Sequence, residues 1–210
     1  LVTRAFLFFS YPSAMTGDSK VWVAQDQICS LGNNLADVAT SATPLGAAVE
    51  AGFQGFDCQT VINAVVGLIP GSVGETSVIA IALGAILLLW TGVASWKTML
   101  SVFVGGALMG FVLQGVEGNH ILWYQHLVFG GFAFGAVFMA TDPVTSARTE
   151  CGKYVYGFLI GVVAVMVRVL NPGFPEGMML AILLMNAFAP LIDYCFVQSN
   201  INKRAKRAIK

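Results

Sequence analysis

The chain has 210 residues, of which 57% are hydrophobic and 10% are charged, and its formal net charge is zero. A soluble domain usually carries about 25% charged residues. This deficit, with a mean hydropathy of +0.77, argues against a soluble globular domain. The composition predicts an all-α integral membrane protein, and we expect no nucleic-acid partner.

The chain begins within apolar sequence and shows no signal-peptide pattern. We expect residues 1–12 to be the end of a truncated transmembrane helix, in the C-terminal part of a longer or processed protein. Residues 13–75 are expected to form an external polar segment, because residues 1–75 hold six acidic and only two basic residues. Within it, the apolar run 61–69 is too short to cross a bilayer and predicts a re-entrant or half helix.

A helix start is predicted at Thr43 and Pro44. A hydroxyl side chain followed by proline is typical of an N-cap and the first helical position. Thr43 therefore either caps a short helix or carries a phosphate, which would meet free backbone N–H groups and the positive end of the helix dipole there.

Five apolar stretches are candidates to cross a bilayer, which needs about 20 residues of helix. The charged residues at positions 75, 97, 117 and 142 enclose stretches of 21, 19 and 24 uncharged residues. These stretches and two later ones predict a five-helix membrane domain over 76–199, followed by a basic tail over 200–210. The predicted spans are 76–96, 98–116, 124–141, 154–171 and 177–197.

The positions of the basic residues predict the orientation. If the basic tail is cytoplasmic, the 142–153 loop and the turn at Lys97 are cytoplasmic too. The opposite loops, 117–123 and 172–176, then hold no Lys or Arg. Thr43 is accordingly expected on the non-cytoplasmic side.

Charged residues within or beside spans are candidates for function. Asp193 either caps or pairs at the interface or helps an ion to enter. Asp142 either caps its loop or serves an ion or cofactor. Arg168 either snorkels to the surface or pairs, or it faces an anion.

Two similar blocks, 70–75 and 172–177, place a Pro-Gly turn and a glutamate just before a span. Glu75 and Glu176 either favour helix entry through the dipole or belong to broken helices that line an ion or cofactor site. The glycine-rich faces of the spans fit close helix packing or contact with a planar cofactor. The four cysteines and two histidines lack metal-ligand spacing, so we expect them to pack and expect no metal site.

The residues Asp37-x-x-Thr40-Ser41-Ala42-Thr43 resemble the flavin-transfer motif of the Na+-translocating NADH:quinone reductases and the related Rnf complexes. In that family, a flavin transferase joins FMN through its phosphate to the last threonine of the motif. The resemblance implies covalent FMN on Thr43. Asp37, Thr40 and Ala42 match the recognition pattern, and Ser41 stands where the family usually has glycine.

Longer blocks are similar to the NqrB subunits of these reductases and to their Rnf homologues, the RnfD subunits. The resemblance implies a ten-helix fold of two related halves, of which this chain is the second. The tail after Phe196 favours the NqrB group. The similar blocks lie at 4–12, 69–77, 130–144, 171–178 and 189–194.

The resemblance implies a multi-pass subunit of a bacterial inner-membrane NADH:ubiquinone reductase, with the flavin segment periplasmic and the C-terminus cytoplasmic. Electrons would pass from partner subunits to FMN, then to riboflavin and ubiquinone, coupled to Na+ export. Arg168 would be a partner for the FMN phosphate, and the redox chemistry would belong to the flavin rather than to catalytic residues. The ion-path candidates are Asp193, Asp142, Glu176 and Glu75.

Two other functions stay open on the sequence. The chain is similar enough to the RnfD subunits for a role in ferredoxin:NAD electron transport. A small-solute channel or transporter, with Thr43 only a helix cap, fits the broken helices and the faint repeat equally well. Flavin content separates this last function from the other two.

Overall fold

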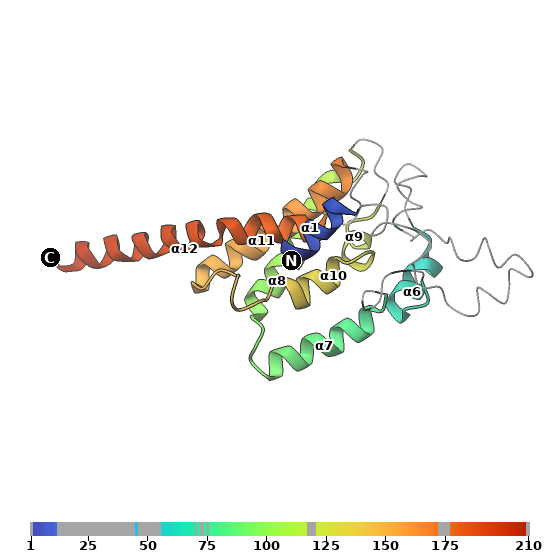
Figure 1. Ribbon diagram of the computed structural model, residues 1–210, viewed down its shortest axis with the longest axis horizontal. Coiled ribbons are helices and arrows are strands. Elements are labelled where there is room, and N and C mark those ends of the chain that lie inside the picture. Colours follow the sequence, from blue (N-terminus) through green and yellow to red (C-terminus); the bar gives the residue numbers. More distant parts are fainter. Residues whose placement is uncertain are drawn as a thin grey trace, which may run out of the picture.

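The computed structural model describes residues 2–11, 45, 56–69, 71, 74, 76–116, 121–171 and 177–208. All secondary-structure elements within these ranges are helices, which confirms the all-α prediction. Figure 1 shows a bundle of α8, α11 and α12 with α7 and α6 along one side. The helices are α1 (Val2–Ser10), α6 (Cys58–Val66), α7 (Val78–Trp90), α8 (Trp96–Leu113), α9 (Gln125–Val128), α10 (Phe132–Phe134), the π-helix η2 (Gly135–Met139), α11 (Glu150–Leu170) and α12 (Met178–Ala208).

Three helices are long and apolar enough to cross a membrane. They are Trp96–Leu113, Glu150–Leu170 and Met178–Arg207. These helices support an integral membrane protein, while the count of five spans remains a prediction. The apolar helix α7, Val78–Trp90, has 13 residues, which span about 20 Å at 1.5 Å per residue.

The closest helix contact joins α8 to α11, and glycine makes it possible. A methyl group on Gly161 would lie 2.2 Å from the carbonyl oxygen of Val102 and 2.5 Å from the backbone nitrogen of Gly106. A methyl group on Gly105 would lie 2.3 Å from the carbonyl oxygen of Phe158. The two backbones therefore touch at this crossing, as small residues allow in membranes. Helix packing, one of the two roles open to these glycines, is what the structure shows here.

The prediction of one continuous helix over 124–141 is wrong. This stretch consists of α9, α10 and η2, with a break between α9 and α10. Gly130 has a φ of +69° at the break, a left-handed conformation that only glycine adopts readily. After the break, Phe132 and Ala136 are fully buried in the main core against α11 and α12. The sequence hid the break because hydrophobicity alone does not distinguish a helix from a buried irregular chain.

The short helix predicted near 61–69 is present as α6, Cys58–Val66, of nine residues. Asp57 begins it, with the carboxylate accepting the Cys58 N–H at 2.9 Å. Gly67, with a φ of +107°, ends it. Ala64 and Ile69 pack against Phe129 in a small separate core, so this helix lies beside the break in the third predicted span.

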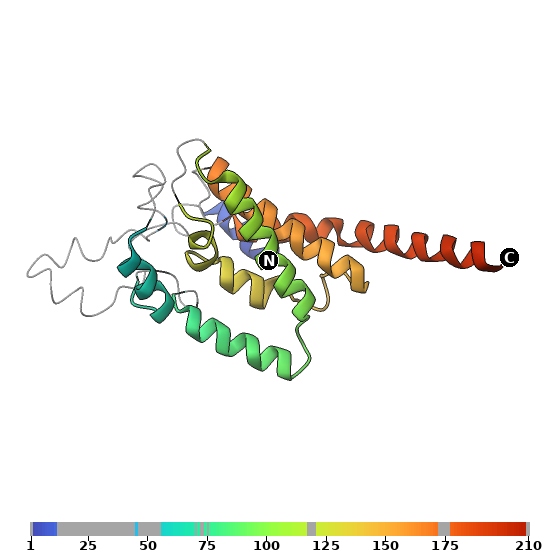
Figure 2. The same ribbon diagram turned by 180° about the vertical axis from the view of Figure 1, so that it is seen from behind.

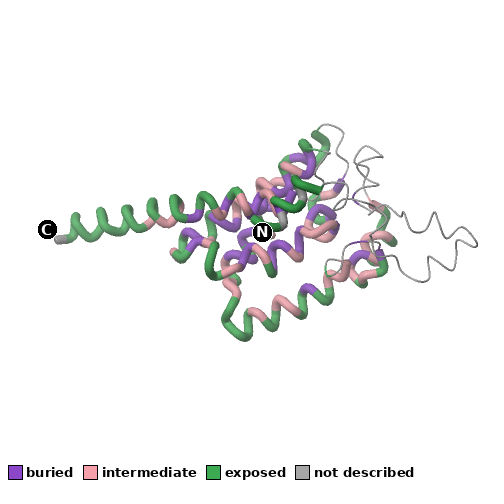
Figure 3. The backbone as a smooth tube through the Cα atoms, viewed as in Figure 1, coloured by how far each residue is buried: buried purple, intermediate pink, exposed green. Residues whose placement is uncertain are grey.

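Helix α12 extends well past the span predicted for it. It has 31 residues and includes Pro190, so its length is about 46 Å, against a hydrocarbon thickness of about 30 Å. The basic tail is helical as far as Ala208 and projects beyond the bundle (Figures 1 and 2). Figure 3 shows that this projecting part is exposed throughout.

Candidate functional site

The described polar side chains gather at the two ends of α11. We name the group around its C-terminal end the α9 cluster (Leu45, Phe56, Gln125, His126, Gly130, Arg168). We name the group around its N-terminal end the Asp193 network (Arg148, Thr149, Asp193). Thr149 and Arg168 are 19 residues apart, which is about 28 Å along a helix. The two groups are thus separated by about the thickness of a hydrocarbon core.

Gln125 organises the α9 cluster. Its amide donates to the carbonyl of Phe56 at 2.9 Å and accepts the N–H of Phe56 at 3.3 Å. It also accepts the N–H of Leu122 at 3.0 Å. The side chain is fully buried, and the Phe56 ring stacks on Phe129 with centroids 3.9 Å apart. These bonds join the end of the 13–75 segment to the membrane helices.

Arg168 is buried, at 2% exposure. Snorkelling to the surface, which the sequence allowed, is therefore wrong. Its Nη1 donates to the carbonyl of His126 at 2.7 Å, so the guanidinium spans from α11 to α9. A buried cation needs compensating polar or charged groups around it. The sequence could place Arg168 one turn from the end of a helix but not decide which side of that helix faced the protein.

Leu45 connects this cluster with the predicted flavin segment. It is the one residue between 12 and 55 that the structure describes, it is helical, and its side chain is 3% exposed. A methyl group on Gly130 would lie 3.2 Å from Leu45 Cδ2 and 3.2 Å from Arg168 Nη2. Gly130 therefore lies between Leu45 and the guanidinium. The segment around Leu45 is anchored beside Arg168.

His126 is buried beside Arg168, and neither of its ring nitrogens has a hydrogen-bond partner in the described part of the chain. Packing, the role expected for the histidines, fits His126. It does not fit the cysteines that the structure describes, since Cys58, Cys151 and Cys195 are exposed. No sequence pattern indicated the contact between His126 and Arg168, because they are 42 residues apart.

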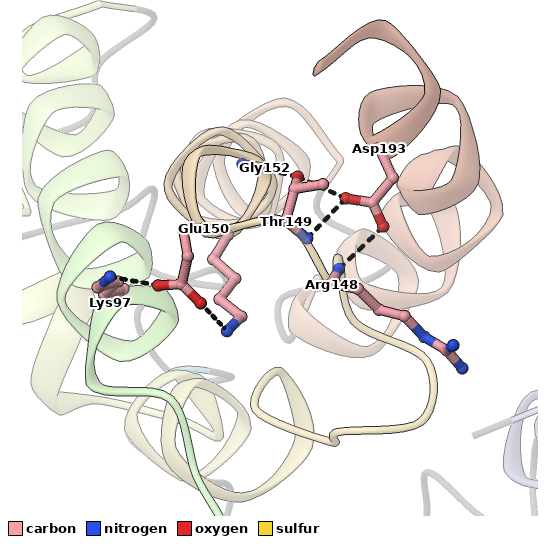
Figure 4. A network of polar contacts seen from close by, with 7 residues as sticks. Lys97, Arg148, Thr149, Glu150, Gly152 and Asp193 are labelled. Carbon is pink, nitrogen blue, oxygen red and sulfur yellow. Dashed lines mark hydrogen bonds and ion pairs between the residues drawn. The ribbon is translucent and has the colours of Figure 1, made fainter. Parts of the chain in front are cut away.

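Asp193 caps the start of α11 from the neighbouring helix α12. Its carboxylate accepts the N–H of Arg148 at 2.8 Å, the N–H of Thr149 at 3.0 Å and the hydroxyl of Thr149 at 2.6 Å (Figure 4). Thr149 Oγ1 in turn accepts the N–H of Gly152 at 3.1 Å. Of the two roles predicted for Asp193, the structure shows the capping one, and its role in an ion path is untested.

Asp142 also has a local role. Its carboxylate accepts the N–H of Val144 at 3.1 Å and the hydroxyl of Thr145 at 2.8 Å. These bonds stabilise the turn that follows η2, as predicted for a loop cap. They leave its predicted ion role untested.

The remaining predicted site residues lie outside the described residues. They are Asp37, Thr40, Ser41, Ala42, Thr43, Glu75 and Glu176. The structure therefore tests neither the flavin motif nor the two glutamates.

The chain matches the NQR2, RnfD, RnfE family over residues 1–202. It belongs to this family. It is 53% identical to the B-type subunit of the Na(+)-translocating NADH-quinone reductase of Chromohalobacter salexigens, over 99% of this chain and 49% of that protein. It is 46% identical to the subunits of the same name from Ectopseudomonas mendocina and Azotobacter vinelandii, over 100% of this chain and 51% of each relative.

The chain spans about half the length of these family relatives. The family match extends from α1 into the C-terminal part of α12, so it includes both ends of α11. The α9 cluster and the Asp193 network are thus parts of a domain of the NQR2, RnfD, RnfE family. Sequence reasoning identified Asp193 and Arg168 through their charge in apolar surroundings but missed Gln125 and His126, which carry no fixed charge.

Proposed function

We propose that the chain is the C-terminal half of the NqrB subunit of a Na+-translocating NADH:ubiquinone reductase and carries FMN covalently on Thr43. The observation that carries this proposal is similarity over the whole chain to relatives named as this type of subunit. The same stretch includes Asp37, Thr40, Ser41 and Ala42, which resemble the recognition motif for a flavin transferase.

The α9 cluster supports a place for the FMN phosphate. Leu45 follows Thr43 by two residues, so the two Cα atoms are at most about 7 Å apart. Leu45 and the Arg168 guanidinium both approach Gly130. A phosphate on the Thr43 side chain would therefore come near a buried cation, which favours phosphate strongly at low local dielectric. Arg168 is the proposed positioning partner of that phosphate.

The proposed electron path runs from NADH-oxidising partner subunits to this FMN, and then to riboflavin and ubiquinone. When bound, the flavin supplies the electron-transfer chemistry, and the chain holds its phosphate and excludes water around it. The proposed transported ion is Na+. Asp193 and Asp142 on one side, and Glu75 and Glu176 on the other, are the candidates for its path.

The proposed sidedness follows from charge. Lys203, Arg204, Lys206 and Arg207 on the projecting end of α12 lie on the same side of the bundle as the α11 N-terminus. A concentration of basic residues is typical of the cytoplasmic side of a bacterial inner membrane. The α9 cluster, about 28 Å away along α11, and the FMN would then be periplasmic.

An in-gel fluorescence experiment tests the flavin site. The protein is produced together with its flavin transferase, denatured, separated by electrophoresis and viewed under near-ultraviolet light. Wild type and Thr40→Val should fluoresce, and Thr43→Val should be dark. A dark wild-type band would contradict the proposal and favour a solute channel. Purification with the partner subunits separates an Rnf role, which requires ferredoxin as electron donor, from the NADH reductase.

A further inference from the structure

A basic pocket lies at the end of the bundle that holds the Asp193 network. It has a volume of about 500 Å³, within the range of sites that hold small molecules or headgroups. The loop between α7 and α8 forms one wall and the start of α11 the other. We call it the α8–α11 pocket, and its charged lining residues are Lys97, Arg148, Glu150 and Lys153.

Positive charge dominates this pocket. Three cations face a single carboxylate, that of Glu150, which pairs with Lys97 and also with Lys153 at 2.8 Å. The nearby carboxylates of Asp142 and Asp193 are engaged by hydrogen-bond donors of their own loops. An anion entering the pocket therefore meets an excess of positive charge.

Arg148 is the cation that is available for such an anion. Its backbone N–H donates to Asp193, and its side chain is exposed and extends away from the network in Figure 4. Within the described ranges, its guanidinium makes no hydrogen bond or ion pair. Lys97 and Lys153, by contrast, already share Glu150.

The start of α8 adds free backbone donors to the same pocket. Ser95, its N-cap residue, makes no side-chain capping bond, and Ser95, Trp96 and Lys97 all line the pocket. Unpaired N–H groups in the first turn of a helix favour an anion, as does the positive end of the helix dipole. These donors supplement the cations.

The surroundings indicate that the anion belongs to a lipid. Trp90 ends α7 and Trp96 begins α8, with 90% and 53% of their surfaces exposed. Tryptophan is enriched where helices leave the hydrocarbon core. From Trp96, an apolar stripe of half-exposed residues at four-residue spacing follows α8, and acyl chains can lie along it. Its further members are Leu100, Val104 and Leu108.

We propose that the α8–α11 pocket binds the phosphate of an anionic phospholipid, with Arg148 as the main ligand and the first turn of α8 as a second donor. The acyl chains would lie along the stripe from Trp96 to Leu108. This inference depends on the membrane location of the helices and not on the flavin. Basic pockets between transmembrane helices are a known setting for such headgroups.

Lipid retention tests this proposal. The intact protein is purified from mixed phosphatidylglycerol and phosphatidylethanolamine, and the lipids that remain bound are measured by native mass spectrometry. Arg148→Gln keeps the backbone bond to Asp193 and should lower phosphatidylglycerol retention about fivefold relative to wild type. Arg207→Gln, on the projecting end of α12, removes the same charge and should retain phosphatidylglycerol like wild type.

Three results would overturn the proposal. Unchanged retention in Arg148→Gln would show that this side chain holds no headgroup. An equal loss in Arg207→Gln would show that only the overall charge attracts lipid. Inorganic phosphate that raises the thermal stability of the protein as much as phosphatidylglycerol does would indicate a site for a free anion instead of a lipid.

Discussion

The carboxylate of Asp193 accepts the hydroxyl hydrogen of Thr149 at 2.6 Å, and this bond joins the middle of α12 to the first turn of α11. The same Thr149 oxygen caps α11 by accepting the N–H of Gly152. A charge that sequence reasoning assigned to either a cap or an ion path is therefore part of the joint between two long helices.

Asp193→Asn should destabilise the protein by about 1–2 kcal/mol, because an amide replaces one of two oxygens that accept from Arg148 and Thr149. Thermal unfolding in detergent measures the effect. Asp142→Asn is the matched control, since asparagine also suits a turn of that kind, and its stability should stay near wild type. Equal stability of the two variants would contradict the joint at Asp193.

Enzyme turnover of the same Asp193→Asn variant tests the proposed ion path separately. If Asp193 helps Na+ to enter, the Na+ concentration for half-maximal turnover should rise while FMN stays attached. An unchanged Na+ dependence in a folded variant would leave Asp193 with its structural role alone.

Gly161→Ala should separate α8 from α11 and lower stability by about 1–3 kcal/mol or more, because the added methyl group meets backbone atoms that cannot move aside. Since transmembrane helices are formed before they associate, the better helix propensity of alanine offsets little of this cost. The yield of folded protein in detergent and its unfolding temperature measure the loss.

The matched control for Gly161→Ala is Gly84→Ala. There the methyl group would lie 2.5 Å from Cζ of Phe138, the end of a ring that can turn away. This variant should lose less stability. A Gly161→Ala protein as stable as Gly84→Ala would argue against the close crossing of α8 and α11.

Gln125→Met should destabilise the α9 cluster by roughly 2–4 kcal/mol, because both backbone groups of Phe56 and the N–H of Leu122 lose their partner. Thermal unfolding measures the loss, and Gln114→Met, at the exposed end of α8, should have little effect. Gln125→Glu adds a pH test. Only a protonated carboxyl can donate to the Phe56 carbonyl, so this variant should gain stability as pH falls, and no gain would contradict the bond.

Arg168→Gln should lower the midpoint potential of the FMN by tens of millivolts, because a nearby buried cation stabilises the more negative, reduced flavin. Redox titration of the flavin absorbance gives the potential. Arg168→Lys keeps the charge and should stay closer to wild type. An unaltered potential in a folded, flavinylated Arg168→Gln protein would remove Arg168 from the surroundings of the cofactor.

The sequence predicted those parts of the fold that depend on hydrophobic length. The helices α8, α11 and α12 lie within or across spans read from apolar runs between charges. The short helix α6 was also predicted, because an apolar run of nine residues cannot cross a bilayer. Length and polarity fix these elements locally, without reference to the rest of the chain.

The break at Gly130 and the burial of Arg168 could not be predicted in the same way. Both depend on contacts between distant residues. Gly130 lies against Leu45 and Arg168, and Arg168 faces α9 because its bond acceptor, the carbonyl of His126, is 42 residues away. Gln125 was missed for a related reason: an uncharged amide in an apolar stretch has no distinctive pattern until its partner, Phe56, is known.

The mass of the intact polypeptide tests the central claim most directly. The protein is produced with its flavin transferase, and wild type is compared with Thr43→Val and Thr40→Val by mass spectrometry. A phosphoester at Thr43 predicts wild-type and Thr40→Val masses that exceed the amino-acid sum by one FMN less one water, and a Thr43→Val mass without the increment. A wild-type mass equal to that of its amino acids alone would contradict the flavin-carrying subunit.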